Sequence, residues 1–516
     1  MKRPAFIALF CVLFIGLHVS HAEEKHLWGN LEKGAYNVGY KVFHEYDYSR
    51  TFKSSKDYHG DFVAAETARP VQISVWYPAA ADFKPDYMKY KEYIYTIATE
   101  SDFSANSDTD KDARIQAYIH SAVNIHGREE DIIKLLGSNT SVVKNAPARD
   151  GTFPLIIYAS SFTSSPAENS LLFEYISSHG YIIAAIPCVG PHSPSMSIDA
   201  KGLDAQMRDL EFVLHFMRAY PGVTCDNVGT MGFSWGGFSN VLVSLRNSDI
   251  DAVVSLDGAI GSARFKELAA TFAYHDPLEL RVPFMYLSSS QKREHWFYDG
   301  AKYSNRYLLT FPDLTHQNFT SDGILKIIRA GTAFLNRFQD KGVVGAGYEA
   351  ICKYTLAFFN RYLKNNQKAE EFLVKTPREN DITVNVSDHG FRPAEQAPPT
   401  EDQLYAIIVE EGLEAATKIY ERFRNDNPDA TFINRSFLTG LGYELFDANK
   451  YDLGIDVFRF GTIIYPESAD SFASLATAYV LLGNNEAALK NYRKALELRP
   501  DDSRIQSRIK ILESEK

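Results

Sequence analysis

A serine in the middle of the chain stands in a setting that restricts the local fold. Gly232–Gly236 reads G-x-S-x-G, an apolar run over Val228–Met231 precedes it, and a helix-like run over Gly237–Leu245 follows. A strand, a sharp turn and a helix in that order predict a nucleophile elbow, with Ser234 in a strained conformation at its tip. Glycine at both ends of the motif removes side chains that would clash where the chain approaches itself. The turn directs the serine hydroxyl out of the top of a sheet.

The bulk properties of the chain limit its class. With 516 residues it is too long for one hydrophobic core, so we expect two or more domains. A hydrophobic content of 45%, of which aromatic residues are a large part, is typical of a packed globular protein. The formal net charge is −11 and no basic stripe interrupts the mixed charges, so nucleic acid is not an expected partner.

The first residues read as a targeting segment. A positively charged start, Met1–Arg3, precedes an apolar core over Ala5–Leu17 and small residues at Ser20 and Ala22. This order predicts a signal peptide over residues 1–22 and an exported protein, periplasmic or extracellular after cleavage. The alternative is a membrane anchor, but the apolar core is shorter than the roughly 20 residues that a spanning helix needs. We therefore expect no transmembrane anchor.

Three cysteines remain after that cleavage: Cys188, Cys225 and Cys352. An odd number leaves at least one of them free. Cys188 ends a predicted strand and Cys225 precedes the next one, which places them at opposite edges of a parallel sheet, too far apart for a disulfide. We expect all three to be free and structural.

Residues 23–375 alternate between strands and helices. Two early strands, over residues 36–43 and 69–78, come before a regular series of continuous apolar strands and amphipathic helices. Continuous apolar strands separated by helices indicate a mostly parallel sheet covered on both faces, so we predict the α/β class and an α/β-hydrolase fold. The later predicted strands are 154–159, 181–186, 228–231, 252–257, 282–288 and 307–311, and the helices are 170–178, 204–220, 237–245, 323–340 and 348–365.

Residues 85–150 look like an insertion into this series. Helices are predicted over Asp110–Val123 and Glu129–Leu136, and a polar loop follows them to Gly151. A helical insertion before the third strand either caps the active site or packs against the outside of the sheet. The sequence leaves both arrangements open.

The C-terminal part of the chain has a different character. Residues 376–400 are polar and rich in proline, which indicates a linker. Within residues 401–516, aligning Pro466 with Pro500 gives a period of 34 that also aligns small and aromatic positions. That period is typical of tetratricopeptide repeats; the clearest copy is Ala469–Asp502, and Ser503–Glu515 would be a capping helix. The alternative is a helical bundle without repeats.

A serine nucleophile needs a base, and the base needs an orienting acid. In α/β-hydrolases these follow in the order serine, acid, histidine, at the carboxyl ends of strands. His316 lies just after the last predicted strand and is therefore the expected base. Two acids fit by position, Asp257 after the strand that follows the elbow and Glu294 after the next one, and geometry alone leaves both open.

The oxyanion hole is expected to use main-chain donors. One is the N–H of Trp235, the residue after the nucleophile, and the other comes from the loop that follows Ala159. In that loop, Phe162 is the expected donor. The side chains of the loop are not expected to take part.

Residues 36–365 resemble the platelet-activating-factor acetylhydrolases of the plasma type and their bacterial dienelactone-hydrolase-like relatives. The matching stretches are Val75–Pro78, 154–158, 178–185, 232–237, 255–258 and 316–319. The resemblance implies Ser234 as nucleophile, Asp257 as acid and His316 as base, with Phe162 and Trp235 as oxyanion donors. It implies no metal and, as in the plasma-type members, no calcium.

This chain departs from the family's pattern in two places. The His-Gly of the family's oxyanion loop is Ser160-Ser161 here, which leaves the acyl specificity open. The C-terminal repeats also have no part in the resemblance.

Together these observations predict an exported serine hydrolase that cleaves carboxylic esters through a Ser-His-Asp triad and an acyl-enzyme. The expected substrate is a small-molecule or lipid-like ester, and no cofactor or metal is expected. The repeats predict docking of a protein partner or of a second copy of the chain. Two alternatives are a peptidase or thioesterase that uses the same triad, and a repeat-based scaffold with a vestigial hydrolase domain.

Overall fold

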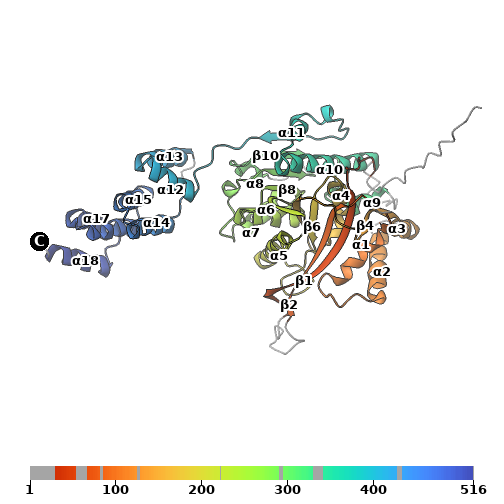
Figure 1. Ribbon diagram of the computed structural model, residues 1–516, viewed down its shortest axis with the longest axis horizontal. Helices are drawn as coiled ribbons and strands as arrows, with labels where there is room; N and C mark the ends of the chain where they lie inside the picture. Colours follow the sequence, from red (N-terminus) through yellow and green to blue (C-terminus); the bar gives the residue numbers. More distant parts are fainter. Residues whose placement is uncertain are drawn as a thin grey trace, which may run out of the picture. The chain divides into compact units, whose positions relative to one another are not determined.

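The computed structural model of the protein describes residues 29–53, 67–81, 85–124, 128–220, 222–289, 295–328, 341–426 and 433–514. The described chain divides into two compact units, with the boundary between Glu395 and Gln396. The first contains an 11-stranded sheet with helices on both faces, and the second is built of helices (Figure 1). None of the helices in these ranges is long and apolar enough to cross a bilayer. The predicted signal peptide, residues 1–22, lies outside the described residues.

The sheet has the strand order β11-β10-β9-β8-β7-β5-β6-β2-β1-β4-β3. Six neighbouring strands, from β10 to β6, are parallel, and β2 runs antiparallel to both β6 and β1. This is the α/β-hydrolase arrangement, so the predicted fold class is confirmed. The strands are β1 (Asn37–Lys53), β2 (Thr67–Ala79), β3 (Tyr87–Lys89), β4 (Asn139–Lys144), β5 (Phe153–Ala159), β6 (Ile182–Ile186), β7 (Val223–Phe233), β8 (Ala252–Leu256), β9 (Phe284–Ser288), β10 (Arg306–Thr310) and β11 (His389–Arg392).

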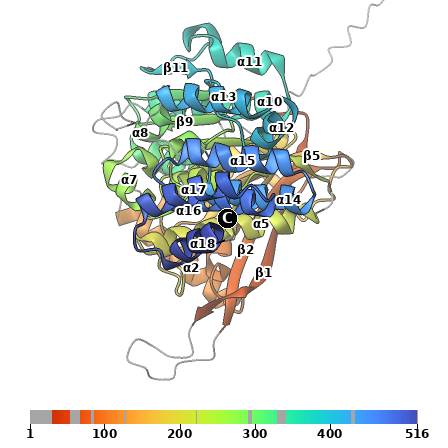
Figure 2. The same ribbon diagram turned by 90° about the vertical axis from the view of Figure 1, so that its left-hand side faces the viewer.

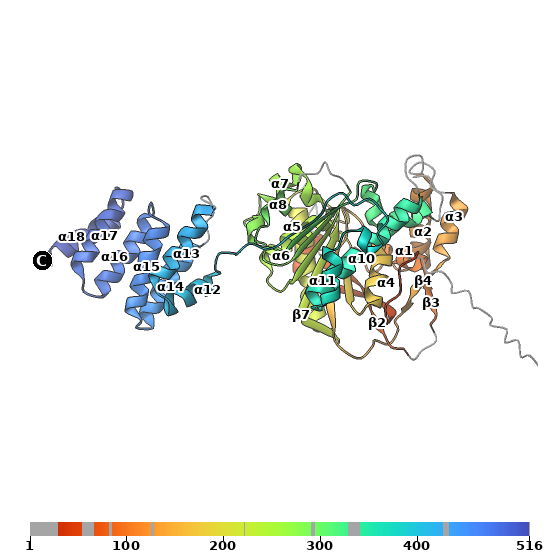
Figure 3. The same cartoon turned by 90° about the horizontal axis from the view of Figure 1, so that it is seen from above.

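Helices cover both faces of the sheet because its central strands are apolar on both sides. In β5, Ile156 and Tyr158 join one buried cluster, while Leu155 and Ile157 join another on the opposite face. Helices α4, α9 and α10 contribute to the first cluster, and α5 and α6 to the second. Figure 3 shows α4 and α10 on one side of the sheet and α5 and α6 on the other. The helices of this unit are α1 (Lys91–Tyr95), α2 (Asp108–Asn124), α3 (Glu129–Leu136), α4 (Ser170–Ser178), α5 (Ala200–Arg218), α6 (Gly236–Arg246), α7 (Ala263–Ala269), α8 (Trp296–Gly300), α9 (Ser321–Ile328), α10 (Lys341–Leu363) and α11 (Gln367–Val374).

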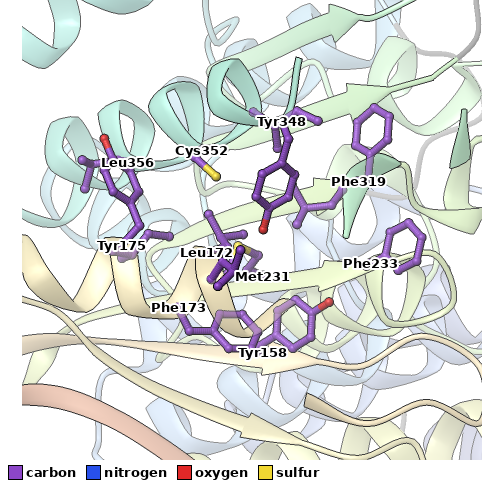
Figure 4. Packing of buried hydrophobic residues seen from close by; sticks show 14 of the residues in the cluster. Tyr158, Leu172, Phe173, Tyr175, Met231, Phe233, Phe319, Tyr348, Cys352 and Leu356 are labelled. Carbon is purple, nitrogen blue, oxygen red and sulfur yellow. The ribbon is translucent and has the colours of Figure 1, made fainter. Parts of the chain in front are cut away.

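The first cluster joins the sheet to α4 and α10. Figure 4 shows Met231 of the sheet against Leu172 of α4, with Tyr348 and Cys352 of α10 above them. All four side chains are buried, and Met231 and Leu172 each contribute about 1.5–3 kcal/mol on leaving water. This packing fixes the helix pair behind the sheet edge that carries Ser234.

The insertion is not purely helical. Residues 139–144, predicted as part of a polar loop, form β4, which pairs with β1 and with β3. The sequence pattern conceals this strand because two of its three buried residues, Thr140 and Ser141, are polar. The Thr140 hydroxyl donates to the Met88 carbonyl at 2.8 Å, and the Ser141 N–H donates to Glu174 at 3.0 Å. The insertion therefore extends the sheet beyond β1. Figure 2 shows the long ribbon that β1 forms with β2.

The helices of the insertion pack onto the main fold. The Tyr93 hydroxyl accepts a hydrogen bond from the Trp76 indole and donates one to Glu174 of α4, at 2.9 Å each. Tyr118 of α2 donates to Asp322 of α9 at 2.6 Å. These contacts place the insertion against the outside of the sheet and against α4 and α9.

Part of the predicted linker is also a strand. Residues 389–392 form β11, which pairs antiparallel with β10, so the linker prediction is wrong at these positions. The strand is too short to show a periodicity in the sequence. Its side chains contact residues that are far away in the chain. The Phe391 ring lies 4.7 Å from the Tyr307 ring, and the Arg392 guanidinium lies over the Tyr298 ring.

The second unit consists of antiparallel helix pairs. Helix α16 begins 34 residues after α14, and α17 begins 34 residues after α15, as the predicted period requires. Small residues lie where the helices touch: Ala476, Ala488 and Ala495 are fully buried. The helices are α12 (Glu401–Glu410), α13 (Leu413–Asp426), α14 (Arg435–Asp447), α15 (Tyr451–Ile464), α16 (Ala469–Leu481), α17 (Asn485–Leu498) and α18 (Ser503–Ser514).

Replacing each of two glycines of α14 with alanine should have opposite effects on stability. A Cβ on Gly442 would lie 2.5 Å from the ring of Phe458, which is buried, whereas nothing lies within 4 Å of a Cβ on Gly440. We expect Gly442→Ala to destabilise the helix pair by about 1–3 kcal/mol through overpacking. Gly440→Ala should stabilise it by about 0.5–1 kcal/mol through helix propensity. Hydrogen exchange of α14 and α15 peptides measures both; equal protection in the two variants would contradict the prediction.

Candidate active site

Ser234 lies at a strained turn between β7 and α6. Its φ is 55°, a left-handed value that serine rarely adopts. A Cβ on Gly232 would lie 2.2 Å from the Gly236 carbonyl oxygen, and one on Gly236 would lie 2.0 Å from the Ala159 carbonyl oxygen. Only glycine fits at both positions, so the G-x-S-x-G pattern follows from this backbone geometry. The turn is held from outside, because the Ser234 N–H donates to the Leu256 carbonyl at 3.1 Å.

His316 lies beside the serine. It begins the helical turn η5 (His316–Phe319), in the loop that follows β10. Its Nε2 is 2.9 Å from Ser234 Oγ, and its Nδ1 is 2.5 Å from Asp257 Oδ2. The imidazole packs against the Phe233 ring with 4.6 Å between centroids. This arrangement fits a ring that carries its proton on Nδ1 and accepts from the serine on Nε2.

Asp257 follows β8 and is fully buried. Both of its carboxylate oxygens receive a hydrogen bond from Ser289, one from the backbone N–H and one from the hydroxyl, each at 2.8 Å. Its own N–H donates to the Leu287 carbonyl at 2.7 Å, with φ at 41°. The backbone and Ser289 therefore fix the carboxylate in the direction of His316.

The structure brings together the three side chains predicted as a triad. Ser234, His316 and Asp257 form one hydrogen-bonded series at the carboxyl ends of β7, β8 and β10. The rival acid, Glu294, lies outside the described residues. The catalytic roles of the three residues stay predictions at this point.

The expected oxyanion donors lie in adjoining segments. Within the described parts of the chain, neither the Phe162 N–H nor the Trp235 N–H has a hydrogen-bond acceptor. The two rings meet edge to face at 5.8 Å between centroids. Both amides are therefore open to a ligand oxygen, and the short approach of Gly236 to Ala159 keeps their segments together.

The loop after β5 is held by side chains that the sequence analysis missed. Gln206 of α5 donates to the Ser160 carbonyl and accepts from the Ser239 hydroxyl, both at 2.8 Å. Glu168 accepts from the Ser161 N–H at 2.9 Å and from its hydroxyl at 2.6 Å. No sequence motif marks either residue. In the sequence, a glutamate within the polar stretch Pro166–Asn169 is interpreted as a surface charge, although its carboxylate is buried in the fold.

No thiol or metal site competes with this serine in the described ranges. Burial raises the pKa of the Cys188 and Cys352 thiols, so neither is a ready thiolate, and both are free. Nothing is described of the Cys225 side chain. A search of the same ranges for three or more clustered histidine, cysteine, aspartate or glutamate side chains that could hold a metal ion finds none.

Comparison with known proteins identifies part of the chain. Residues 469–502 match the family model of the tetratricopeptide repeat, which confirms the repeat predicted there. No curated protein sequence matches the chain. Among solved structures, it is similar to a ferulic acid esterase from Streptomyces cinnamoneus at 19% identity, with a TM-score of 0.46 over 70% of this chain and 98% of that one. The fold and the repeat together define an α/β-hydrolase-fold unit followed by helical repeats.

Glu100 of the insertion generates a prediction for stability against pH. Its Oε1 is buried and has no partner among the described residues. Burial raises the pKa of this carboxyl to about 8; a hydrogen bond from Ser165 and the charge of Arg114 lower it, and Glu168 raises it. The folded state keeps a proton that the unfolded state has lost, so this carboxyl destabilises the fold increasingly from pH 4.5 to about 8.

Glu100→Gln is neutral at every pH. The Tm of the variant relative to the parent should therefore rise by several degrees across that window and stay level below it. Thermal unfolding followed in a pH series measures the difference. Parallel Tm curves for the two proteins would contradict the assignment of a buried, protonated Glu100.

Proposed function

We propose that this protein is a serine hydrolase that cleaves carboxylic esters through Ser234, His316 and Asp257. The observation that supports it is the position of His316, which lies 2.9 Å from the serine oxygen and 2.5 Å from a buried carboxylate. A serine hydroxyl is a weak nucleophile alone, and a neutral imidazole at hydrogen-bond distance can take its proton during attack. Nothing in this chemistry needs a cofactor.

Acylation starts with attack of Ser234 Oγ on the ester carbonyl carbon while His316 Nε2 takes the serine proton. The carbonyl oxygen becomes an oxyanion, for which the N–H groups of Phe162 and Trp235 are the donors. The tetrahedral intermediate collapses as the imidazolium returns its proton to the leaving alkoxide, which departs as an alcohol. Asp257 holds the imidazole in the required tautomer and stabilises its charged form.

Deacylation repeats the sequence with water. His316 Nε2 takes a proton from the water as its oxygen attacks the acyl carbon, and the second tetrahedral intermediate expels Ser234, which regains the proton. The products of this step are a carboxylic acid and the free enzyme.

The proposal extends to the location of the enzyme, its substrate class and its partner. Export rests on the predicted signal peptide, and a small or lipid-like ester rests on the resemblance to plasma-type platelet-activating-factor acetylhydrolases. The repeat over residues 469–502 supports docking of a protein partner or a second copy of the chain, since stacked repeats form extended binding surfaces. A panel of esters, thioesters and aminoacyl amides separates esterase from thioesterase and peptidase activity.

Ser234→Ala should remove turnover of p-nitrophenyl acetate, by on the order of 10⁶ in kcat if the full triad effect is present. Ser244→Ala is the matched control, because Ser244 lies on α6, the helix that follows Ser234, and its hydroxyl donates to the Val241 carbonyl. The control should keep the parent rate. Equal turnover by Ser234→Ala and the parent protein would exclude this mechanism.

A second pair of variants decides between the two acids. Asp257→Asn should lower kcat by about 10⁴, as in serine proteases whose triad acid is replaced, because the amide favours the wrong tautomer of His316. Glu294→Gln should leave kcat unchanged. The reverse pattern would transfer the role of the acid to Glu294.

A further inference from the structure

Two neighbouring side chains of the turn η2 (Pro166–Asn169) contact both loops of the candidate site. The Glu168 carboxylate faces the loop after β5, and the Asn169 amide faces the chain that follows His316. Glu168 is 8% exposed and Asn169 is fully buried. Buried polar groups of this kind are held in place by hydrogen bonds. The hydrogen-bond partners of Glu168 and Asn169 therefore show which segments of the chain these two side chains position.

Glu168 fixes the peptide groups around Ser161. Its Oε1 accepts from the Ser161 N–H at 2.9 Å and its Oε2 from the Ser161 hydroxyl at 2.6 Å. The Ser161 carbonyl accepts from the Ser164 N–H at 2.9 Å, which closes a turn. Because a peptide group is planar, fixing that carbonyl also fixes the direction of the next N–H, which belongs to Phe162.

Asn169 fixes the chain just beyond His316. Its Nδ2 donates to the Phe319 carbonyl at 3.2 Å, and its Oδ1 accepts from the Ser321 N–H at 3.1 Å. The amide orientation is unambiguous, because a carbonyl can only accept and a backbone N–H can only donate. The Tyr348 hydroxyl donates to the same Oδ1 at 3.1 Å, which ties this point to α10.

A tyrosine joins the two halves of this network. The Tyr158 hydroxyl donates to Glu168 Oε1 at 2.8 Å and accepts from Asn169 Nδ2 at 3.1 Å. Tyr158 is fully buried in the cluster that also holds Tyr348 (Figure 4). The backbone adds a further link, since the Ser321 hydroxyl donates to the Glu168 carbonyl at 3.1 Å.

We propose that Glu168 is a positioning residue for the oxyanion donor of Phe162, and that Asn169 and Tyr158 couple this loop to the loop of His316. This inference rests on the proposed function, because it concerns the same site. Glu168 touches no reacting atom. It acts through Ser161, and its loss should leave substrate binding intact while the donor loses its fixed direction.

The test compares Glu168→Ala with Glu174→Ala. Glu174 is a matched control: it is also buried, and it accepts from one tyrosine hydroxyl, of Tyr93, and one backbone N–H, of Ser141. These two partners belong to the insertion and not to the loop after β5. Both variants lose a buried carboxyl, so both should be destabilised, and assays are run where circular dichroism shows each to be folded.

For Glu168→Ala we expect kcat on p-nitrophenyl acetate to fall about 10-fold to 100-fold with KM unchanged, less than the 10²–10³ lost when a donor is removed outright. The inhibition constant of a trifluoromethyl ketone, which forms a tetrahedral adduct with the serine, should rise by the same factor. Glu174→Ala should keep both values. A folded Glu168→Ala protein with the kcat and the ketone affinity of the control would overturn the proposal.

The coupling is tested by a double-mutant cycle with Asn169→Ala. If Glu168 and Asn169 act as one unit, the double variant should lose less kcat than the product of the two single losses. Independent losses would overturn the coupling. If an alanine variant does not fold, Glu168→Gln against Glu174→Gln gives the same comparison, because Gln keeps only one oxygen for the donors of Glu168.

These outcomes are separate from a failure of the proposed function. Were the esterase proposal wrong, the parent protein itself would show no turnover that depends on Ser234. Were only this inference wrong, the parent protein would be active and Glu168→Ala would match Glu174→Ala.

Discussion

The close contact between the elbow and the loop after β5 is the constraint on which the rest of the site depends. Gly236 approaches the Ala159 carbonyl so closely that no side chain fits between them. This contact exists because β5 and β7 are neighbours in the sheet, with Ala159 paired to Gly232. Ser234 and Phe162, the proposed nucleophile and oxyanion donor, lie 72 residues apart in the chain and are thereby brought into adjoining segments. Because β8 and β10 run parallel to β7, their carboxyl ends lie at the same edge of the sheet, and this topology brings Asp257 and His316, the proposed acid and base, to Ser234.

The parts of the fold that the sequence predicted are those with a strong local signal. The central strands are continuous apolar runs, and Ser170–Ser178 and Glu129–Leu136 are helices with the predicted bounds. The strands β4 and β11 were missed because two of the three buried residues of β4 are polar and β11 has only four residues, so tertiary contacts decide both. In the site, motif and chain order predicted Ser234 and His316. The supporting groups Glu168, Asn169 and Gln206 have no motif, since their roles depend on partners brought together only by folding.

The cores of the two units are packed in different ways. In the first, large aromatic side chains fill the space between the sheet and α4 and α10, and buried polar groups such as Tyr158 hydrogen-bond to side chains of other elements. In the second, neighbouring helices approach through alanine and glycine, as at Gly442 beside Phe458. The period of 34 was therefore readable from the sequence, because each repeat places its small residues at the same positions.

Three residues around the site have left-handed backbones although none is glycine: Ser234, Asp257 and Thr163, with φ of 55°, 41° and 52°. Each such conformation raises the free energy of the folded chain by about 1–3 kcal/mol. They follow β7, β8 and β5, three adjacent strands, so the strained residues lie along one edge of the sheet. The packing that offsets this strain lies in the core of the unit. Local unfolding should therefore begin at this edge. Inactivation by mild heat or denaturant would then precede loss of the fold, and the activity would be a more sensitive reporter of damage than the secondary structure.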